Sequence, residues 1–75
     1  FNPITNITYG VPEYANVAIV VYDISGRQVH SLLSEFQSPG YHSVAWDADN
    51  YPSGVYFIKM IAGEYVNTQK LMLVK

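Results

Sequence analysis

Hydrophobic residues recur at every second position along most of this chain, and this period constrains the fold more than any other feature. Ile7, Tyr9 and Val11 alternate with smaller or polar residues, and residues 41–47 place Val44 and Trp46 on one face. Successive side chains of a β-strand point to opposite faces of its sheet, so this period indicates half-buried strands. Turn residues interrupt the pattern roughly every 8–12 residues, which is typical of small all-β domains.

Two segments are more apolar than simple alternation requires. Residues 15–24 (ANVAIVVYDI) are nearly continuously apolar and β-branched, which predicts a central strand buried on both faces. Residues 27–33 are expected to return as its partner, while residues 29–37 (VHSLLSEFQ) fit a helix and a strand equally well. Residues 55–61 and 65–75 complete the series. The pattern predicts an all-β chain, a small Ig-like or fibronectin-like antiparallel β-sandwich of about six to seven strands.

Composition excludes several classes of function. The formal net charge is −2, and only 13% of the residues are charged, against about 25% in an average domain. The basic residues Arg27, Lys59, Lys70 and Lys75 are scattered, whereas a nucleic-acid-binding domain carries a basic stripe. No cysteine is present to form disulfides or thiolate metal sites. No apolar run approaches the ~20 residues of a transmembrane helix. We therefore expect neither nucleic-acid binding nor a membrane span.

The length allows one small domain, residues 1–75. Because the chain opens abruptly at Phe1, Asn2 and Pro3, we expect it to be a piece of a longer protein. Its single tryptophan, three phenylalanines and seven tyrosines are the expected substitute for disulfides, since each large ring buries about 150–250 Å². Trp46 is the expected centre of the core.

No residue pattern indicates a cofactor. Residues 47–50 (DADN) resemble the start of a calcium loop, but the residues that follow lack the required glycine and glutamate. A turn whose side chains bond their own backbone explains the same residues. A low-affinity metal site at Asp47, Asp49 and Asn50 stays open as the alternative.

Catalytic arrangements are equally absent from the pattern. His30 and Ser31 are adjacent on one expected strand, so they point to opposite faces and cannot form a base and nucleophile pair. His30 and His42 could meet across strands, but no third metal ligand is apparent. The glutamates all fall at expected turns and form no carboxylate pair for glycoside hydrolysis; they are Glu13, Glu35 and Glu64. We expect no enzyme.

Five motifs, in order along the chain, resemble one known family. They are residues 1–9 (FNPITNITY), 21–29 (VYDISGRQV), 39–47 (PGYHSVAWD), 53–57 (SGVYF) and 70–75 (KLMLVK). Together they are similar to the type A C-terminal sorting domains carried by cargo of the type IX secretion system. The Ig-like module of flagellar hook-capping proteins shares some of these motifs. The short loop between residues 47 and 53 favours the sorting domain, because hook-capping modules usually carry a longer insertion.

The residues that carry the resemblance are expected to be structural. They are Tyr22, Asp23, Gly26, Arg27, Trp46, Asp47, Gly54 and Tyr56. Asp23 can accept backbone N–H groups across the turn and can pair with Arg27. Gly54 is expected to need either a positive φ or a close backbone approach.

The resemblance implies a non-catalytic sorting signal that follows an N-terminal passenger. It also implies recognition by the outer-membrane secretion machinery, removal by a sortase-like peptidase, and export through the periplasm of a Gram-negative bacterium to the cell surface or medium. We expect the recognised element to be the last strand, with Lys70, Leu71, Met72, Leu73, Val74 and Lys75. A terminal edge strand offers free backbone groups to a partner, whereas an internal strand does not. The sequence does not decide whether the last strand is an edge strand or an internal one.

Two other functions remain as alternatives. The chain could be an Ig-like structural or adhesive spacer of a cell-surface protein. It could also be a carbohydrate-binding module of a secreted enzyme, which would require three aromatic rings lying coplanar on one face.

Overall fold

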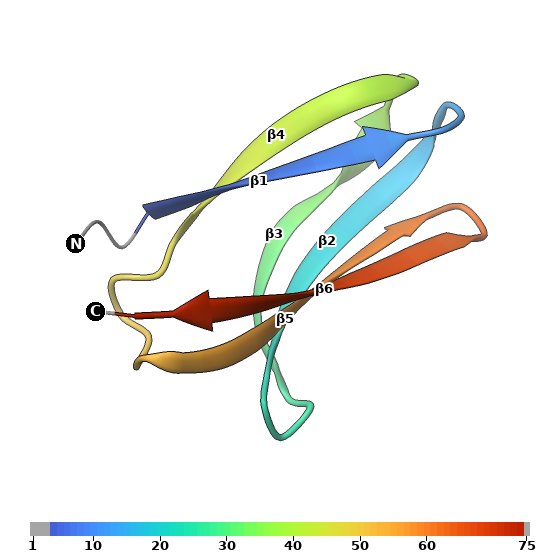
Figure 1. Ribbon diagram of the computed structural model, residues 1–75. Helices are drawn as coiled ribbons and strands as arrows, with labels where there is room; N and C mark the ends of the chain where they lie inside the picture. Colours follow the sequence, from blue (N-terminus) through green and yellow to red (C-terminus); the bar gives the residue numbers. More distant parts are fainter. Residues whose placement is uncertain (1–3, 75) are drawn as a thin grey trace.

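A computed structural model describes residues 4–74, which are all-β and contain no helix (Figure 1). The described strands are β1 (Ile4–Val11), β2 (Ala15–Asp23), β3 (Gln28–Gln37), β4 (Gly40–Asp47), β5 (Gly54–Ala62) and β6 (Tyr65–Leu73). Phe1, Asn2, Pro3 and Lys75 lie outside the described residues. The expected all-β fold is confirmed.

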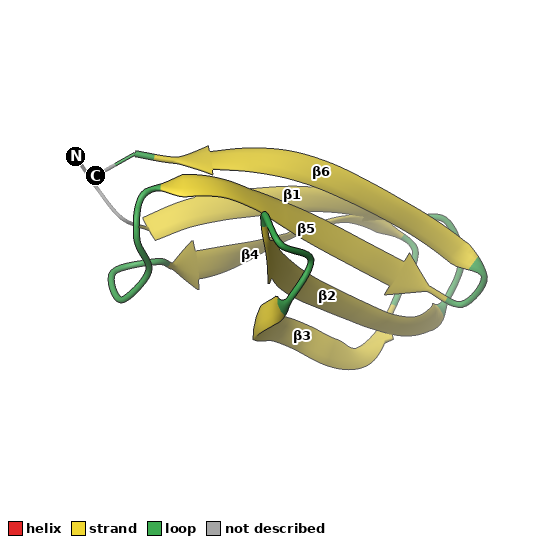
Figure 2. Cartoon of the chain, turned by 90° about the horizontal axis from the view of Figure 1, so that it is seen from below, coloured by secondary structure: helices red, strands yellow, loops and turns green. Residues whose placement is uncertain are grey.

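The strands form two antiparallel layers. β1 pairs with β4 in a two-stranded sheet, and the other sheet has the order β3-β2-β5-β6. Figures 1 and 2 show the β1–β4 layer on one side of the larger sheet. The arrangement is a small β-sandwich, in which a narrow sheet covers one face of a wider one.

The core lies between the two layers and follows the period of two. Each strand that lines it contributes alternate residues, and Trp46 at the end of β4 is fully buried, as expected. The buried hydrophobic residues are Ile7, Tyr9, Val11, Val17, Ile19, Val21, Trp46, Ala48, Tyr56, Ile58, Met60, Ala62 and Leu73. A hydrogen bond joins the layers at their edge, where the Tyr9 hydroxyl donates to Gln37 Oε1 at 2.5 Å.

Two expectations from the sequence are wrong. β2 is central, but it is buried on one face only, because the outward-facing Ala18, Val20 and Tyr22 are half-buried. The two-stranded sheet covers the inner face, and no described residue covers the outer one. Glu35 lies within β3, not at a turn, because β3 runs on to Gln37 as it pairs with β2. The segment that fitted a helix and a strand equally well is therefore a strand.

Candidate functional site

The last strand, β6, is an edge strand of the larger sheet. Among residues 4–74 it pairs with β5 alone, over the whole of its length. Figure 1 shows β6, in red, at the border of the sheet. The question that the sequence left open is thereby answered for this chain, because an edge strand leaves one row of backbone N–H and C=O groups free to bind a partner.

The side chains of the expected recognition segment divide between the two faces of the sheet. Leu71 pairs with the buried Tyr56, and Leu73 is only 2% exposed, so both belong to the core side. Lys70 and Met72 point to the outer side, where Met72 is 63% exposed. Val74 follows the strand and is also exposed. The remaining member, Lys75, lies outside the described residues.

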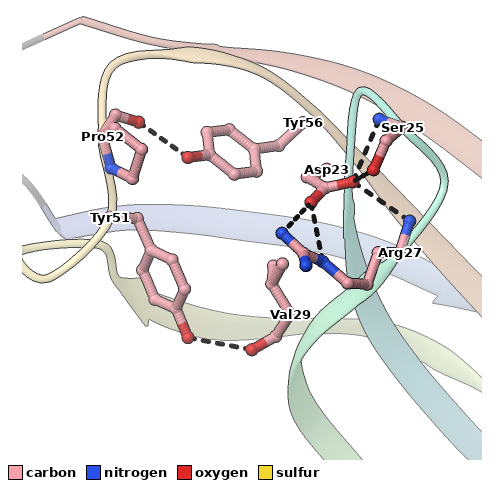
Figure 3. A network of polar contacts seen from close by, with 7 residues as sticks. All are labelled: Asp23, Ser25, Arg27, Val29, Tyr51, Pro52 and Tyr56. Atoms are coloured by element: carbon pink, nitrogen blue, oxygen red, sulfur yellow. Dashed lines mark hydrogen bonds and ion pairs between the residues drawn. The ribbon is translucent and has the colours of Figure 1, made fainter.

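Asp23 organises the turn between β2 and β3 (Figure 3). Its Oδ1 accepts the N–H of Ser25 and of Arg27, each at 3.0 Å, and the Ser25 hydroxyl at 2.6 Å. Its Oδ2 lies 3.3 Å from both Nε and Nη2 of Arg27. The Ser25 hydroxyl, then the Arg27 N–H, lower the pKa of Asp23, because they bond its charged form. Gly26 completes the turn with a φ of +88°. The expected turn and ion pair are confirmed.

Trp46 and Tyr56 belong to a cluster of rings at the end of the sandwich where β4 leads to β5. The ring centroid of Trp46 lies 5.3 Å from that of Tyr56 and 5.4 Å from that of Tyr51. The Tyr56 hydroxyl donates to the Pro52 carbonyl at 2.7 Å, and the Tyr51 hydroxyl to that of Val29 at 3.1 Å (Figure 3). Burial raises the pKa of Tyr56, with a further contribution from the nearby Asp23 charge. These three rings thus contact one another and the backbone of the domain.

The Asp47 loop is a local turn. Asp47 Oδ1 accepts the N–H of Asp49 at 3.1 Å, and the N–H of Tyr51 donates to the Ala48 carbonyl at 3.0 Å. Asn50 lies in the same turn. In the part of the chain that the structure describes, no three His, Cys, Asp or Glu side chains come together in a way that could hold a metal ion. The geometry is that of a turn whose aspartate bonds its own backbone.

The two histidines have separate partners. His42 stacks on Tyr9, with ring centroids 5.6 Å apart, and its Nε2 lies 2.8 Å from the Ser38 carbonyl oxygen. His30 meets the edge of the Tyr51 ring at 6.3 Å. The structure therefore assembles neither histidine into a catalytic or metal-binding group among residues 4–74.

The comparison with protein families decides the identity of the chain. A model described as a secretion system C-terminal sorting domain matches residues 2–75, nearly the whole chain. The chain belongs to the type IX C-terminal sorting domains. The resemblance carried by the five motifs is thus confirmed. Comparisons with curated proteins and with solved structures found no match.

Membership in this family implies a role in export. A type IX sorting domain is a signal attached to an N-terminal passenger, and it interacts with secretion machinery of the Bacteroidetes type. The protein that carries it is secreted or displayed at the cell surface. No helix among the described residues is long and apolar enough to cross a membrane.

The sorting domain also gathers exposed aromatic rings at one end. Tyr14 and Tyr65 line a hollow of about 460 Å³, and Tyr65 and Tyr41 line an adjoining one of about 330 Å³. Tyr14 stacks on Phe36 with centroids 5.5 Å apart. Within residues 4–74, this stacked pair is the only ring contact found among these four exposed residues.

Some residues that shape the sorting domain were not singled out from its sequence. Tyr51 falls in the short loop between residues 47 and 53, yet it packs on Trp46 and bonds the backbone of β3. Gln37 was part of a segment of undecided structure, yet it accepts the hydroxyl of Tyr9. A tyrosine inside an otherwise polar loop is the available signal for Tyr51. No local signal marks Gln37, because its partner is 28 positions away.

Proposed function

We propose that this domain is a non-catalytic export signal that directs an N-terminal passenger through the type IX outer-membrane translocon. A sortase-like peptidase then removes the domain from the passenger. In this proposal residues 1–75 form a single C-terminal domain of a longer secreted protein. The family match supports the sorting role. The observation that carries the mechanism is the open edge of β6, the last strand.

The edge and the outward side chains are proposed as the recognised features. Leu71 and Leu73 anchor β6 to the core, which holds its free backbone edge in an extended conformation. A partner strand can add to such an edge through main-chain hydrogen bonds, and its specificity then comes from alternate side chains. Three described side chains of the segment are exposed and accessible to such a partner: Lys70, Met72 and Val74.

The primary experiment is export of a fluorescent passenger. The passenger is fused to residues 1–75 behind a periplasmic signal peptide and expressed in a type IX-competent bacterium and in its translocon-null sibling. Fluorescence at the surface or in the medium of the competent strain alone is the expected result. Retention in the periplasm of both strains, with the domain folded, would contradict the proposal and favour the spacer or the carbohydrate-binding module.

A second experiment separates recognition from folding. Deleting the last residues would remove Leu73 from the core, so the sharper variant is Met72→Ser combined with Val74→Ser, which changes exposed side chains only. The matched control is Ile24→Ser, because Ile24 is also apolar and is 75% exposed, at the β2–β3 turn. We expect the double variant to lose export and the control to keep it. Equal export of both would show that these side chains are not recognised.

A further inference from the structure

The outward-facing side of the larger sheet is an accessible apolar surface, which we call the outer sheet face. The apolar part of this side lies on three neighbouring strands, β2, β5 and β6, whereas β3 at the far border places the polar Gln28, Ser31 and Ser34 beside β2. The name outer sheet face is kept for the part on β2, β5 and β6. Its side chains are Ala18, Val20 and Tyr22 from β2, Val55, Phe57, Lys59 and Ile61 from β5, and Val66, Thr68, Lys70 and Met72 from β6. Eight of these eleven side chains are apolar or aromatic, and all eleven are half-buried or exposed.

The outer sheet face is more apolar than the packing of the domain itself requires. Strands that are hydrophobic at consecutive positions are typical of sheets covered on both faces. In this chain β2 and β5 have that pattern, yet the β1–β4 sheet covers only the inner face. Tyr22 and Phe57 are register partners on the outer side. Aromatic residues are the most frequent anchors of protein interfaces, so this pair supplies a centre for one.

Charge on the outer sheet face indicates what would cover it. Lys59 pairs with Thr68, and Lys70 with Phe57, so the two lysines are diagonal neighbours. All six acidic residues of the chain lie elsewhere: Glu13, Asp23, Glu35, Asp47, Asp49 and Glu64. Within residues 4–74 neither lysine forms a salt bridge. A chain with a net charge of −2 thus presents one apolar face that carries only positive charge.

We propose that the outer sheet face docks on a protein of the export machinery that presents an apolar surface with carboxylates opposite Lys59 and Lys70. This proposal rests on the proposed function and adds a second recognised surface to the β6 edge. A second copy of the chain fits less well, because both halves of a two-fold interface on this face would carry only positive charge and neither would supply a carboxylate. An anionic membrane also fits less well, since surface-binding segments carry clusters of about 4–8 basic residues.

The test uses one substitution at two matched positions. Thr68 lies on the outer sheet face opposite Lys59, whereas Thr8 lies on the outward side of β1 in the other sheet. Both are exposed strand threonines. Thr68→Glu places a carboxylate beside Lys59 and opposes the partner's carboxylates, while Thr8→Glu makes the same change in net charge away from the face. Thr68→Lys keeps the sign of the face and serves as the conservative variant.

All variants are measured in the passenger-export assay, after circular dichroism and urea unfolding show that each is folded. We expect Thr68→Glu to reduce export on the order of tenfold, because it places a carboxylate against the partner's carboxylates and like charges at an interface oppose binding. Thr8→Glu and Thr68→Lys are expected to keep export. Undiminished export of Thr68→Glu, or equal loss in both glutamate variants, overturns the proposal. If the unaltered domain is not exported, the proposed function itself fails, so the two failures are distinct.

A vesicle experiment separates the protein partner from a lipid surface. The unaltered domain and Thr68→Glu are mixed with vesicles of phosphatidylglycerol and phosphatidylcholine in equal parts, and flotation is measured. We expect no flotation of either protein. Flotation of the unaltered domain that Thr68→Glu abolishes would replace the protein partner by an anionic membrane and overturn the proposal.

Discussion

Leu71 and Met72 are consecutive residues of β6 that lie on opposite faces of the four-stranded sheet. Leu71 pairs with Tyr56 on the core side, whereas Met72 pairs with Val55 on the outer side and is 63% exposed. Residues 71–74, which are apolar at every position, therefore have two roles. One set of side chains attaches the last strand to the core, and the other remains accessible to a partner.

This division predicts that substitutions at neighbouring residues differ strongly in their effect on stability. Leu73→Ala is expected to lower the free energy of unfolding by about 2–5 kcal/mol, because Leu73 is 2% exposed and its removal leaves a cavity. Met72→Ala is expected to change it by less than about 0.5 kcal/mol, as is usual for surface positions. Urea unfolding of both variants measures the difference. Similar costs at the two positions would contradict the assignment of faces.

The pKa of Asp23 predicts how stability depends on acid. Its pKa is lowered in the folded chain by the Ser25 hydroxyl and by the N–H groups of the turn. The unfolded chain therefore takes up the proton first, and the stability that Asp23 contributes is present above its unfolded pKa of about 3.9. That stability is lost as the pH falls through the folded pKa. Asp23→Asn is expected to flatten the acid limb of the stability profile.

The measurement is the urea midpoint of unfolding as a function of pH from neutral to strongly acidic conditions. Ser25→Ala serves as the graded comparison, because it removes the largest cause of the lowered pKa and keeps the carboxylate. Its acid limb should begin at the same pH, which the unfolded pKa sets, but end at higher pH and show a smaller total loss of stability than that of the unaltered chain. An unchanged acid limb in Asp23→Asn would show that other groups control acid stability.

Alanine substitutions at two glycines distinguish the cost of backbone strain from the cost of a steric contact. Gly54 has a φ of +153°, and a Cβ there would meet no atom within 4 Å, so Gly54→Ala is expected to cost about 1–3 kcal/mol through strain alone. A Cβ at Gly10 would lie 3.3 Å from Cε1 of Tyr41, whose side chain is 87% exposed and can move. Gly10→Ala is expected to change stability by less than about 1 kcal/mol. Thermal unfolding of both variants tests this order.

Trp46 is expected to be the most sensitive single position of the core. It is fully buried and contacts the rings of Tyr51 and Tyr56, so Trp46→Ala should cost about 3–5 kcal/mol, enough to unfold a domain of this size. Its Nε1 has no hydrogen-bond partner among residues 4–74, so Trp46→Phe loses no hydrogen bond and should cost much less. Near-ultraviolet circular dichroism and urea unfolding follow both variants. Equal losses would mean that the indole itself, not the ring packing, is required.

Local chemistry was readable from the sequence. The aspartate at position 23, followed by Ser25, Gly26 and Arg27, predicts the turn that the structure shows, because all of its hydrogen bonds connect residues at most four positions apart. The burial of Trp46 followed from the alternation of its strand. The secondary structure of residues 29–37 could not be predicted from the sequence, because their hydrophobic pattern fits the period of a helix and that of a strand. Pairing with β2 makes them a strand.

The sequence by itself determined which residues of the regular strands share a face, the turn at Asp23, and which family the chain belongs to, since each of these depends on spacing along the chain. Only the tertiary structure decided which faces are covered and which strand lies at an edge. The order β3-β2-β5-β6 places β6 at the border, and the two-stranded sheet is the only second layer among residues 4–74, so it covers one side of the four strands and leaves the other open. Burial depends on what packs from elsewhere in the chain, so an apolar pattern identified the outer sheet face as hydrophobic but could not show that it is exposed.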